Sequence, residues 1–389
     1  MLPTLFEPRA AHGTGRSAPM FVVGVDAAAG QLAELESRLA GLRPDWQFAC
    51  PPDAKAALAI AESRPADVVI ADLRAAGMDG VALLREFQSR RPETVRILLS
   101  GHDDEDEALR ALNVAHRVLP KPISAEETAE AVERVRALHG ILSSERIRET
   151  VGRVDRLPPA PRLYLRLTQA MDDPSSDAGQ IAKLVGQDPA LAAKVLQMCN
   201  SALFGGGRQI TDIRSAVTRL GLRALRSIAL AAEAFSRPGA GAGDAQALQR
   251  KALVASTLAS RLLPQRAAAD LAGTAALLAD VGLLLPGLGL DHARLPDFDQ
   301  HGADLPTHAG AGAYLLGLWN LPMPIVEAVA FHHQPTRGGA RQFGIIGAVH
   351  VAVGLAQGHP LDMAFLEATG AIERLPQWQS MFEGFSEAA

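Results

Sequence analysis

The sequence predicts two domains: an α/β domain with a doubly wound, five-stranded parallel sheet, followed by an all-α domain. Up to about residue 140, short apolar runs alternate with segments of helical periodicity, whereas no alternating strand pattern follows Pro161. Alternating strands and helices are typical of a parallel sheet that helices cover on both faces. A chain of 389 residues is long enough for two domains that each bury a core.

Five apolar segments predict the strands of the sheet. They cover residues 21–25, 46–48, 68–71, 95–99 and 117–119. After the first segment, Leu32, Leu35 and Leu39 recur at helical spacing. The carboxyl ends of parallel strands meet at one edge of the sheet, where doubly wound proteins bind their ligands.

Polar residues stand at or just beyond four of these strand ends. They are Asp26, Asp72, Ser100 and Lys121. Two carboxylates, a hydroxyl and a lysine at one edge suit phosphoryl transfer, because that reaction needs a metal ion and a cation around negatively charged oxygens.

Two motifs carry a resemblance to response-regulator receiver domains, over about residues 19–138. They are DLRAAGMDG, which begins at Asp72, and LPKP, which contains Lys121. The resemblance implies that Asp72 accepts a phosphoryl group from a cognate histidine kinase. It further implies that Ser100 is the switch hydroxyl and that Lys121 contacts the phosphate.

The resemblance also implies a Mg²⁺ site at Asp26 and Asp72. Receivers usually end the first strand with two adjacent acids, whereas Ala27 follows Asp26 in this chain. Because the number and charge of oxygen ligands set the affinity for Mg²⁺, we expect weak binding and weak phosphorylation.

Every element expected after Pro161 is a helix. The helices cover 212–220, 222–235, 244–263, 268–279, 308–318, 322–332 and 343–357, and Asp177 and Asp188 cap two earlier helices. Apolar residues after Gly358 predict further helices packed on this bundle. The segment 181–196 has the pattern of a helix-turn-helix, which makes a DNA-binding response regulator an alternative. Its second helix offers Lys194 and Gln197 as its long polar side chains, a poor set for base readout.

Several stretches of the helical half resemble the HDOD family, over about residues 150–353. The matching stretches are LPPAP at 157–161, DPAL at 188–191, CNSALFG at 199–205, LGLRAL at 220–225, the segment 308–322 and the pair His332–His333. HDOD domains are non-catalytic relatives of the HD and HD-GYP phosphohydrolases. The resemblance therefore implies an all-α module that acts by binding a protein partner.

The metal ligands of the catalytic relatives are mostly missing from this chain. In the segment AALLADVG, Asp280 stands where those relatives carry adjacent His and Asp, but Ala279 replaces the histidine. Val353 replaces a later aspartate, and no histidine stands at 249–251. A lone carboxylate holds a transition metal poorly against water, so we expect no transition metal and no enzymatic activity in this domain.

We expect that only a vestigial form of the HD metal site remains. It comprises Asp280, His308, His332 and His333. An HD-type metal-dependent phosphohydrolase or a cyclic-dinucleotide phosphodiesterase is the alternative to a non-catalytic module.

The resemblances divide the chain into four parts. We expect a disordered leader (1–18), a receiver-like domain (19–138), a linker helix (139–156), and an HDOD-like all-α domain with C-terminal helices (157–389). We expect a two-component-type signalling protein whose receiver-like domain regulates the HDOD-like module, and a homodimer is compatible with this organisation.

Composition restricts the partners and the compartment. A net charge of -5 gives no long-range positive field for nucleic acid. The most apolar stretch, 277–290, is interrupted by Asp280 and Pro286, so we expect no membrane span. Cys50 and Cys199 stand among apolar neighbours, which is typical of reduced thiols in a cytoplasmic protein.

Overall fold

The structure is a computed structural model. It describes residues 19–26, 29–101, 114–122, 124–141, 145–154, 170, 177–200, 209–221, 225, 242–285 and 307–386. The expected leader, Ala27, the LPPAP stretch and, apart from residue 225, the helix expected at 222–235 lie outside these ranges.

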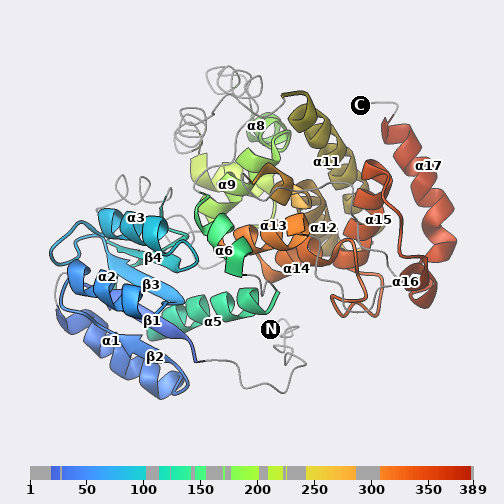
Figure 1. Cartoon of the computed structure of the whole chain (residues 1–389). Helices are drawn as coiled ribbons and strands as arrows, with labels where there is room; N and C mark the ends of the chain where they lie inside the picture. The colour runs from blue at the N-terminus through green and yellow to red at the C-terminus, as the bar shows by residue number, and fades with distance from the viewer. Residues whose placement is uncertain are drawn as a thin grey trace, which may run out of the picture.

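The N-terminal part forms the expected five-stranded parallel sheet (Figure 1). Its strands are β1 (Phe21–Val25), β2 (Gln47–Ala49), β3 (Val68–Asp72), β4 (Val95–Ser100) and β5 (Arg117–Pro120). They pair in the order β2-β1-β3-β4-β5, and every pair is parallel. The fold class predicted from the sequence is therefore confirmed for this part of the chain.

Helices cover both faces of the sheet. They are α1 (Ala29–Leu42), α2 (Ala54–Ser63), α3 (Gly80–Arg90) and α5 (Ala125–Ile141). Val22 packs in one apolar cluster with Leu32 of α1 and Val132 of α5, whereas Val23 packs in the other with Ala57 and Leu83. Because successive side chains of a strand point to opposite faces, each strand supplies both cores.

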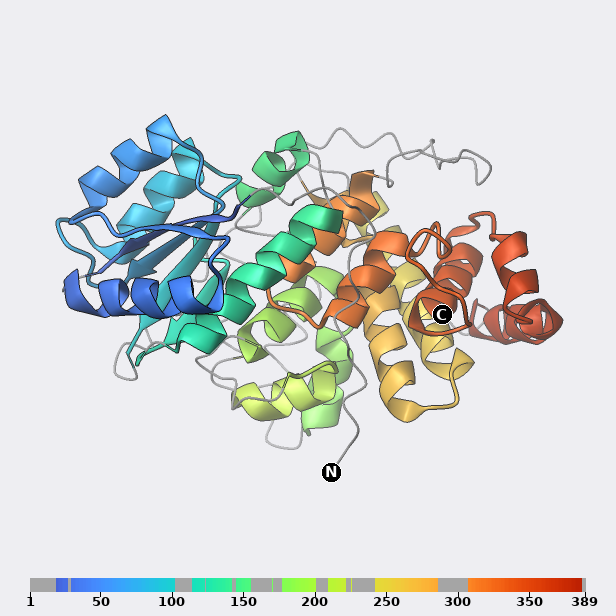
Figure 2. The same cartoon turned by 90° about the horizontal axis from the view of Figure 1, so that it is seen from below.

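The C-terminal part is all-α within the described residues, as expected (Figures 1 and 2). Its elements are α6 (Glu145–Gly152), α8 (Ala178–Val185), α9 (Pro189–Cys199), a helix over 213–221, α11 (Ala242–Leu262), α12 (Arg266–Leu278), the 3₁₀ turn η1 (Val281–Leu284), α13 (Thr307–Leu318), α14 (Met323–Phe331), α15 (Ile345–Gln357), α16 (Met363–Ala368), η2 (Ile372–Arg374) and α17 (Leu375–Ser386). Asp177 caps α8, and the Asp188 carboxylate accepts from the Leu191 amide at the start of α9, so both N-caps occur as predicted.

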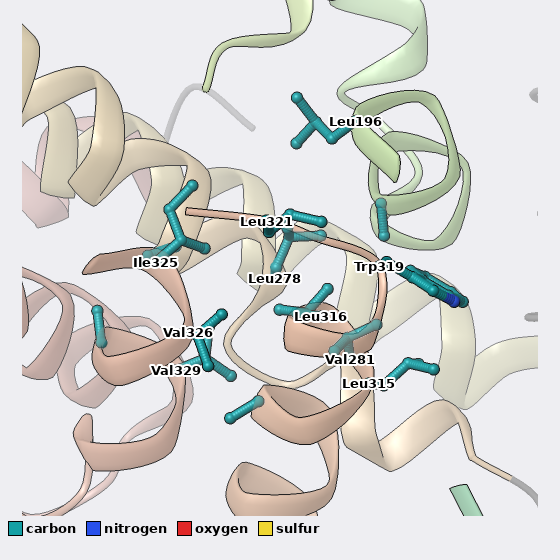
Figure 3. Close-up of a cluster of buried hydrophobic side chains, with 14 of the residues drawn as sticks. Leu196, Leu278, Val281, Leu315, Leu316, Trp319, Leu321, Ile325, Val326 and Val329 are labelled. Carbon is teal, nitrogen blue, oxygen red and sulfur yellow. The ribbon is translucent and has the colours of Figure 1, made fainter. Parts of the chain in front are cut away.

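The core of the helical part is apolar and continuous. Figure 3 shows its centre, where Leu278 of α12, Val281 of η1 and Leu316 of α13 meet Ile325 and Val326 of α14. These five side chains are at most 1% exposed, a degree of burial that makes their packing a main source of stability.

Helix α5 links the two parts by packing against α13 of the helical part (Figure 2). Leu138 of α5 lies directly against Gly317, and the guanidinium of Arg134 donates to the Leu321 carbonyl. His139 stacks on Tyr314, with 3.3 Å between Nε2 and the phenolic oxygen. The N-terminal part and the helical part therefore share a buried contact through α5.

A buried arginine holds α6 at the same junction. Arg96 of β4 is 1% exposed, and its guanidinium donates to the carbonyls of Val114 at 2.7 Å and Gly152 at 2.8 Å. Gly152 is the last residue of α6, so Arg96 connects the sheet to the element that precedes the helical part.

Candidate functional site

The polar strand-end residues gather at the carboxyl edge of the sheet. Asp26 follows β1, Asp72 ends β3 and Ser100 ends β4, while Lys121 follows β5. The Lys121 ammonium pairs with Asp72 and lies 3.9 Å from Asp26 Oδ1. The Ser100 hydroxyl donates to the Gly101 carbonyl at 3.2 Å. Parallel strand order accounts for this convergence, since β1, β3, β4 and β5 are neighbours in the sheet.

Asp72 is held as a carboxylate by its neighbours. It is 3% exposed, and burial by itself raises its pKa, but hydrogen bonds with the side chains of Asp26 and Lys121 outweigh burial and leave the pKa below the ordinary value. The Arg74 amide also donates to Oδ1, at 3.1 Å. An ionised, oriented carboxylate is the form that accepts a phosphoryl group and a hard cation.

The oxygen donors at this edge are chemically suited to Mg²⁺. Asp26 and Asp72 would hold the ion, which would neutralise charge on a transferring phosphoryl group.

A second cluster lies in the helical part and joins four residues from three segments. Asp280 precedes η1, His308 lies in the first turn of α13, and His332 and His333 follow α14. Each of them offers one ligand atom, and the four atoms lie within 4.8 Å of one another. The structure thus brings together the whole set that the sequence predicts as a vestigial site.

Close backbone packing positions Asp280 beside His308. A Cβ on Gly282 would lie 2.0 Å from the His308 carbonyl oxygen and 3.0 Å from the Gly312 amide nitrogen, so a residue with a side chain cannot stand there without moving α13. The glycine two residues after Asp280 was therefore a local sequence signal of close approach.

Burial favours the neutral form of His332 and His333. It lowers the pKa of His332 to about 4, although the hydrogen bond to the Val329 carbonyl partly opposes the shift. Burial and the neighbouring histidines lower the pKa of His333 as well. Neutral imidazole is the form that binds a metal ion.

The replaced HD positions are apolar in space as well as in sequence. Ala279 is fully buried and Val353 is 1% exposed, and both belong to the hydrophobic core. These positions provide no ligand on their side of Asp280.

Sequence reasoning missed two residues that support the cluster from α15. The Gln357 amide donates to Asp280 Oδ2 at 2.6 Å. The ring of His350 donates from Nδ1 to the His332 carbonyl at 2.7 Å and accepts at Nε2 from the Asp362 amide at 2.8 Å. Their spacing of seven residues, two helical turns, places both on one face of α15 and was the available signal.

Family models match both parts of the chain. The response regulator receiver domain matches residues 23–133, and the HDOD domain matches residues 157–289. The chain therefore contains a response regulator receiver domain and an HDOD domain. The HDOD match contains Asp280 and ends before His308, His332 and His333.

Similar proteins include several bacterial regulators. An uncharacterised protein of Treponema pallidum is 27% identical over 246 residues, which are 58% of this chain and 45% of that protein. The DNA-binding transcriptional regulator NtrC of Salmonella typhimurium is 40% identical over 78 residues, 20% of this chain and 17% of NtrC. The chain thus spans less than half the length of these two relatives.

Among solved structures, the MmoQ response regulator of Methylococcus capsulatus is 25% identical, with a TM-score of 0.45. The match covers 58% of this chain and 98% of the MmoQ chain.

None of the helices in the described part of our chain is both long and apolar enough to cross a membrane.

Proposed function

We propose that this response regulator acts through protein–protein interaction, and that the state of its receiver domain controls a non-catalytic HDOD module. The observation that carries the proposal is the buried contact between α5 and α13. The phosphoacceptor Asp72 pairs with Lys121, which shortly precedes α5. Phosphorylation of Asp72 changes the group that Lys121 contacts, and it thereby changes the surroundings of the first turn of α5.

The coupling has a short physical route. Leu138 and His139 of α5 touch Gly317 and Tyr314 of α13, and α13 begins beside His308 of the helical cluster. A shift of α5 therefore acts on a helix that belongs to the HDOD half. A difference of a few kcal/mol between two packings is sufficient for such a population shift.

The described structure disfavours DNA reading by α9. Gln197 is 2% exposed, and every other side chain described in α9 is buried too. A recognition helix has to expose polar side chains to the major groove, and none of the side chains that the structure describes in α9 is exposed. Protein binding fits the HDOD domain better than base readout.

The test uses the full chain as bait, with and without a small acyl-phosphate donor and Mg²⁺. A protein partner should be captured to different extents in the two states, and Asp72→Ala should abolish the difference while capture persists. Amide hydrogen exchange in α5 and α13 should change with the donor and stay constant in Asp72→Ala. If the chain is phosphorylated but neither partner capture nor amide exchange changes with the donor, control by the receiver domain is refuted.

The enzymatic alternative is tested on the same protein. Purified chain is incubated with cyclic dinucleotides and Mn²⁺, Fe²⁺ or Mg²⁺, and we expect no hydrolysis. Hydrolysis that disappears in Asp280→Asn would establish a phosphodiesterase and overturn the non-catalytic assignment.

A further inference from the structure

The cluster around Asp280 combines three imidazoles and one carboxylate in a largely buried site. Asp280, His332 and His333 are between 1% and 6% exposed, and the His308 side chain is 14% exposed. The sequence alone indicated no metal here, because the expected HD ligands are missing. The three-dimensional arrangement supplies a different ligand set.

The orientation of His332 is the first indication of a cation. Its Nδ1 faces the Val329 carbonyl oxygen at 2.8 Å, and a carbonyl can only accept, so Nδ1 carries the ring proton. Nε2 has no hydrogen-bond partner within the described structure, is buried, and lies 4.0 Å from Asp280 Oδ1. A hydrogen bond does not span that distance, whereas a metal ion between the two atoms would give His332 Nε2 a partner.

The other two histidines point to the same place. Nε2 of His308 lies 3.1 Å from Nε2 of His333 and 3.7 Å from Asp280 Oδ1. Two nitrogens bound to one ion at about 2.0–2.1 Å lie roughly 3.0–3.4 Å apart. The observed separation of these two nitrogen atoms therefore suits ligation of a common ion. All four ligand atoms lie within 4.8 Å of one another, so a shift of about 0.7 Å by each atom would bring even the most distant pair into range.

Neighbouring residues fix the orientation of the ligands. Gln357 donates to Asp280 Oδ2, which leaves Oδ1 on the side of the histidines. His350 ties the His332 main chain to α15. Hydrogen bonds of this kind orient ligands in metal sites and raise affinity.

We propose that Asp280, His308, His332 and His333 together bind one divalent transition-metal ion. Three imidazoles and a carboxylate favour ions such as Zn²⁺, Fe²⁺ or Mn²⁺ over Mg²⁺ and Ca²⁺, which prefer oxygen ligands throughout. The ion joins η1, the start of α13 and the end of α14, so it stabilises the bundle to which the receiver domain attaches. The site shares Asp280 with the HD set, whose other ligand positions are occupied by Ala279 and Val353 and lack a histidine at 249–251.

The experiment measures ion binding to the full chain after removal of metal with a chelator. Zn²⁺ and Co²⁺ are titrated calorimetrically, bound metal is counted by elemental analysis after desalting, and Co²⁺ absorption reports low-symmetry nitrogen and oxygen ligation. We expect one ion per chain and a higher unfolding temperature in its presence. Asp280→Asn and His308→Gln should each weaken binding by more than 100-fold, and Gln357→Leu by about 10- to 100-fold.

His359→Gln is the matched control, because the His359 ring lies 5.3 Å from the His333 ring yet is not part of the ligand set. It should keep stoichiometric binding with an affinity within a few-fold of the wild type. A folded wild-type chain that binds no ion stoichiometrically would overturn the proposal even if a variant fails to fold. Binding that survives both Asp280→Asn and His308→Gln, or is lost equally in His359→Gln, would also overturn it.

Discussion

Adding one methyl group at Gly317 should push α5 away from α13. A Cβ at this position would lie 2.1 Å from Cδ2 and 2.8 Å from Cδ1 of Leu138. Carbon atoms in contact are about 3.5–4.0 Å apart, so the overlap exceeds roughly 1 Å. Leu138 is 1% exposed and lies within the core, so its methyl groups have little room to move.

The free energy of unfolding follows from two opposing terms. Overpacking a core costs about 1–3 kcal/mol. Replacing Gly by Ala within a helix offsets about 1 kcal/mol of this cost through helix propensity. We therefore expect Gly317→Ala to lower the free energy of unfolding by up to about 2 kcal/mol.

Gly140→Ala in α5 is the control for the helix-propensity term. No heavy atom lies within 4 Å of a Cβ at this position, so the substitution should raise the free energy of unfolding by about 0.5–1 kcal/mol. Urea unfolding measures both variants, and amide hydrogen exchange locates the change. We expect faster exchange in α5 and α13 of Gly317→Ala alone. Equal stabilisation by the two substitutions, with unchanged exchange at the interface, would refute the predicted contact between the domains.

Three further predictions concern the receiver and its junction. With a small acyl-phosphate donor and Mg²⁺, intact-mass spectrometry should show substoichiometric labelling of Asp72, and Ala27→Asp should increase the labelling because it adds an oxygen ligand for Mg²⁺. Rapid, complete labelling of the wild type would contradict this prediction. Arg96→Met should lower the free energy of unfolding by about 1–3 kcal/mol and speed exchange in α6, because Gly152 loses a buried donor; unchanged protection of α6 would count against it. Burial, together with the charge of Arg148, lowers the pKa of His139 to about 4 in the folded chain. Between about pH 6.5 and pH 4, His139 is therefore protonated in the unfolded chain and neutral in the folded chain. The free energy of unfolding should therefore fall as the pH falls across that range. His139→Gln should decrease the slope of the free energy of unfolding against pH by up to about 1.4 kcal/mol per pH unit, and equal slopes in the two proteins would refute the lowered pKa of His139.

The sheet shows how far local sequence reasoning extends. Each predicted strand agrees with the observed one to within a residue at either end, for example 95–99 against Val95–Ser100. The helices at 244–263 and 343–357 likewise match Ala242–Leu262 and Ile345–Gln357 closely. These elements are fixed by apolar periodicity and by neighbouring cap residues, which are properties of short segments.

The linker region shows a limit of the same reasoning. Helix α5 ends at Ile141 and packs on α13. Periodicity predicts that α5 has an apolar face, but it does not reveal that a helix so distant in the chain covers that face.

Residue identity and short-range periodicity are sufficient to find the residues at the strand ends and to show which HD ligands are missing. Tertiary structure decided which side chains meet: Leu138 with Gly317, Arg96 with Gly152, and the lone pair of His332 with Asp280. These pairs are separated by between 52 and 179 residues of chain. Their contacts depend on how whole helices pack, and helix periodicity shows which face is apolar without specifying the partner to which that face binds.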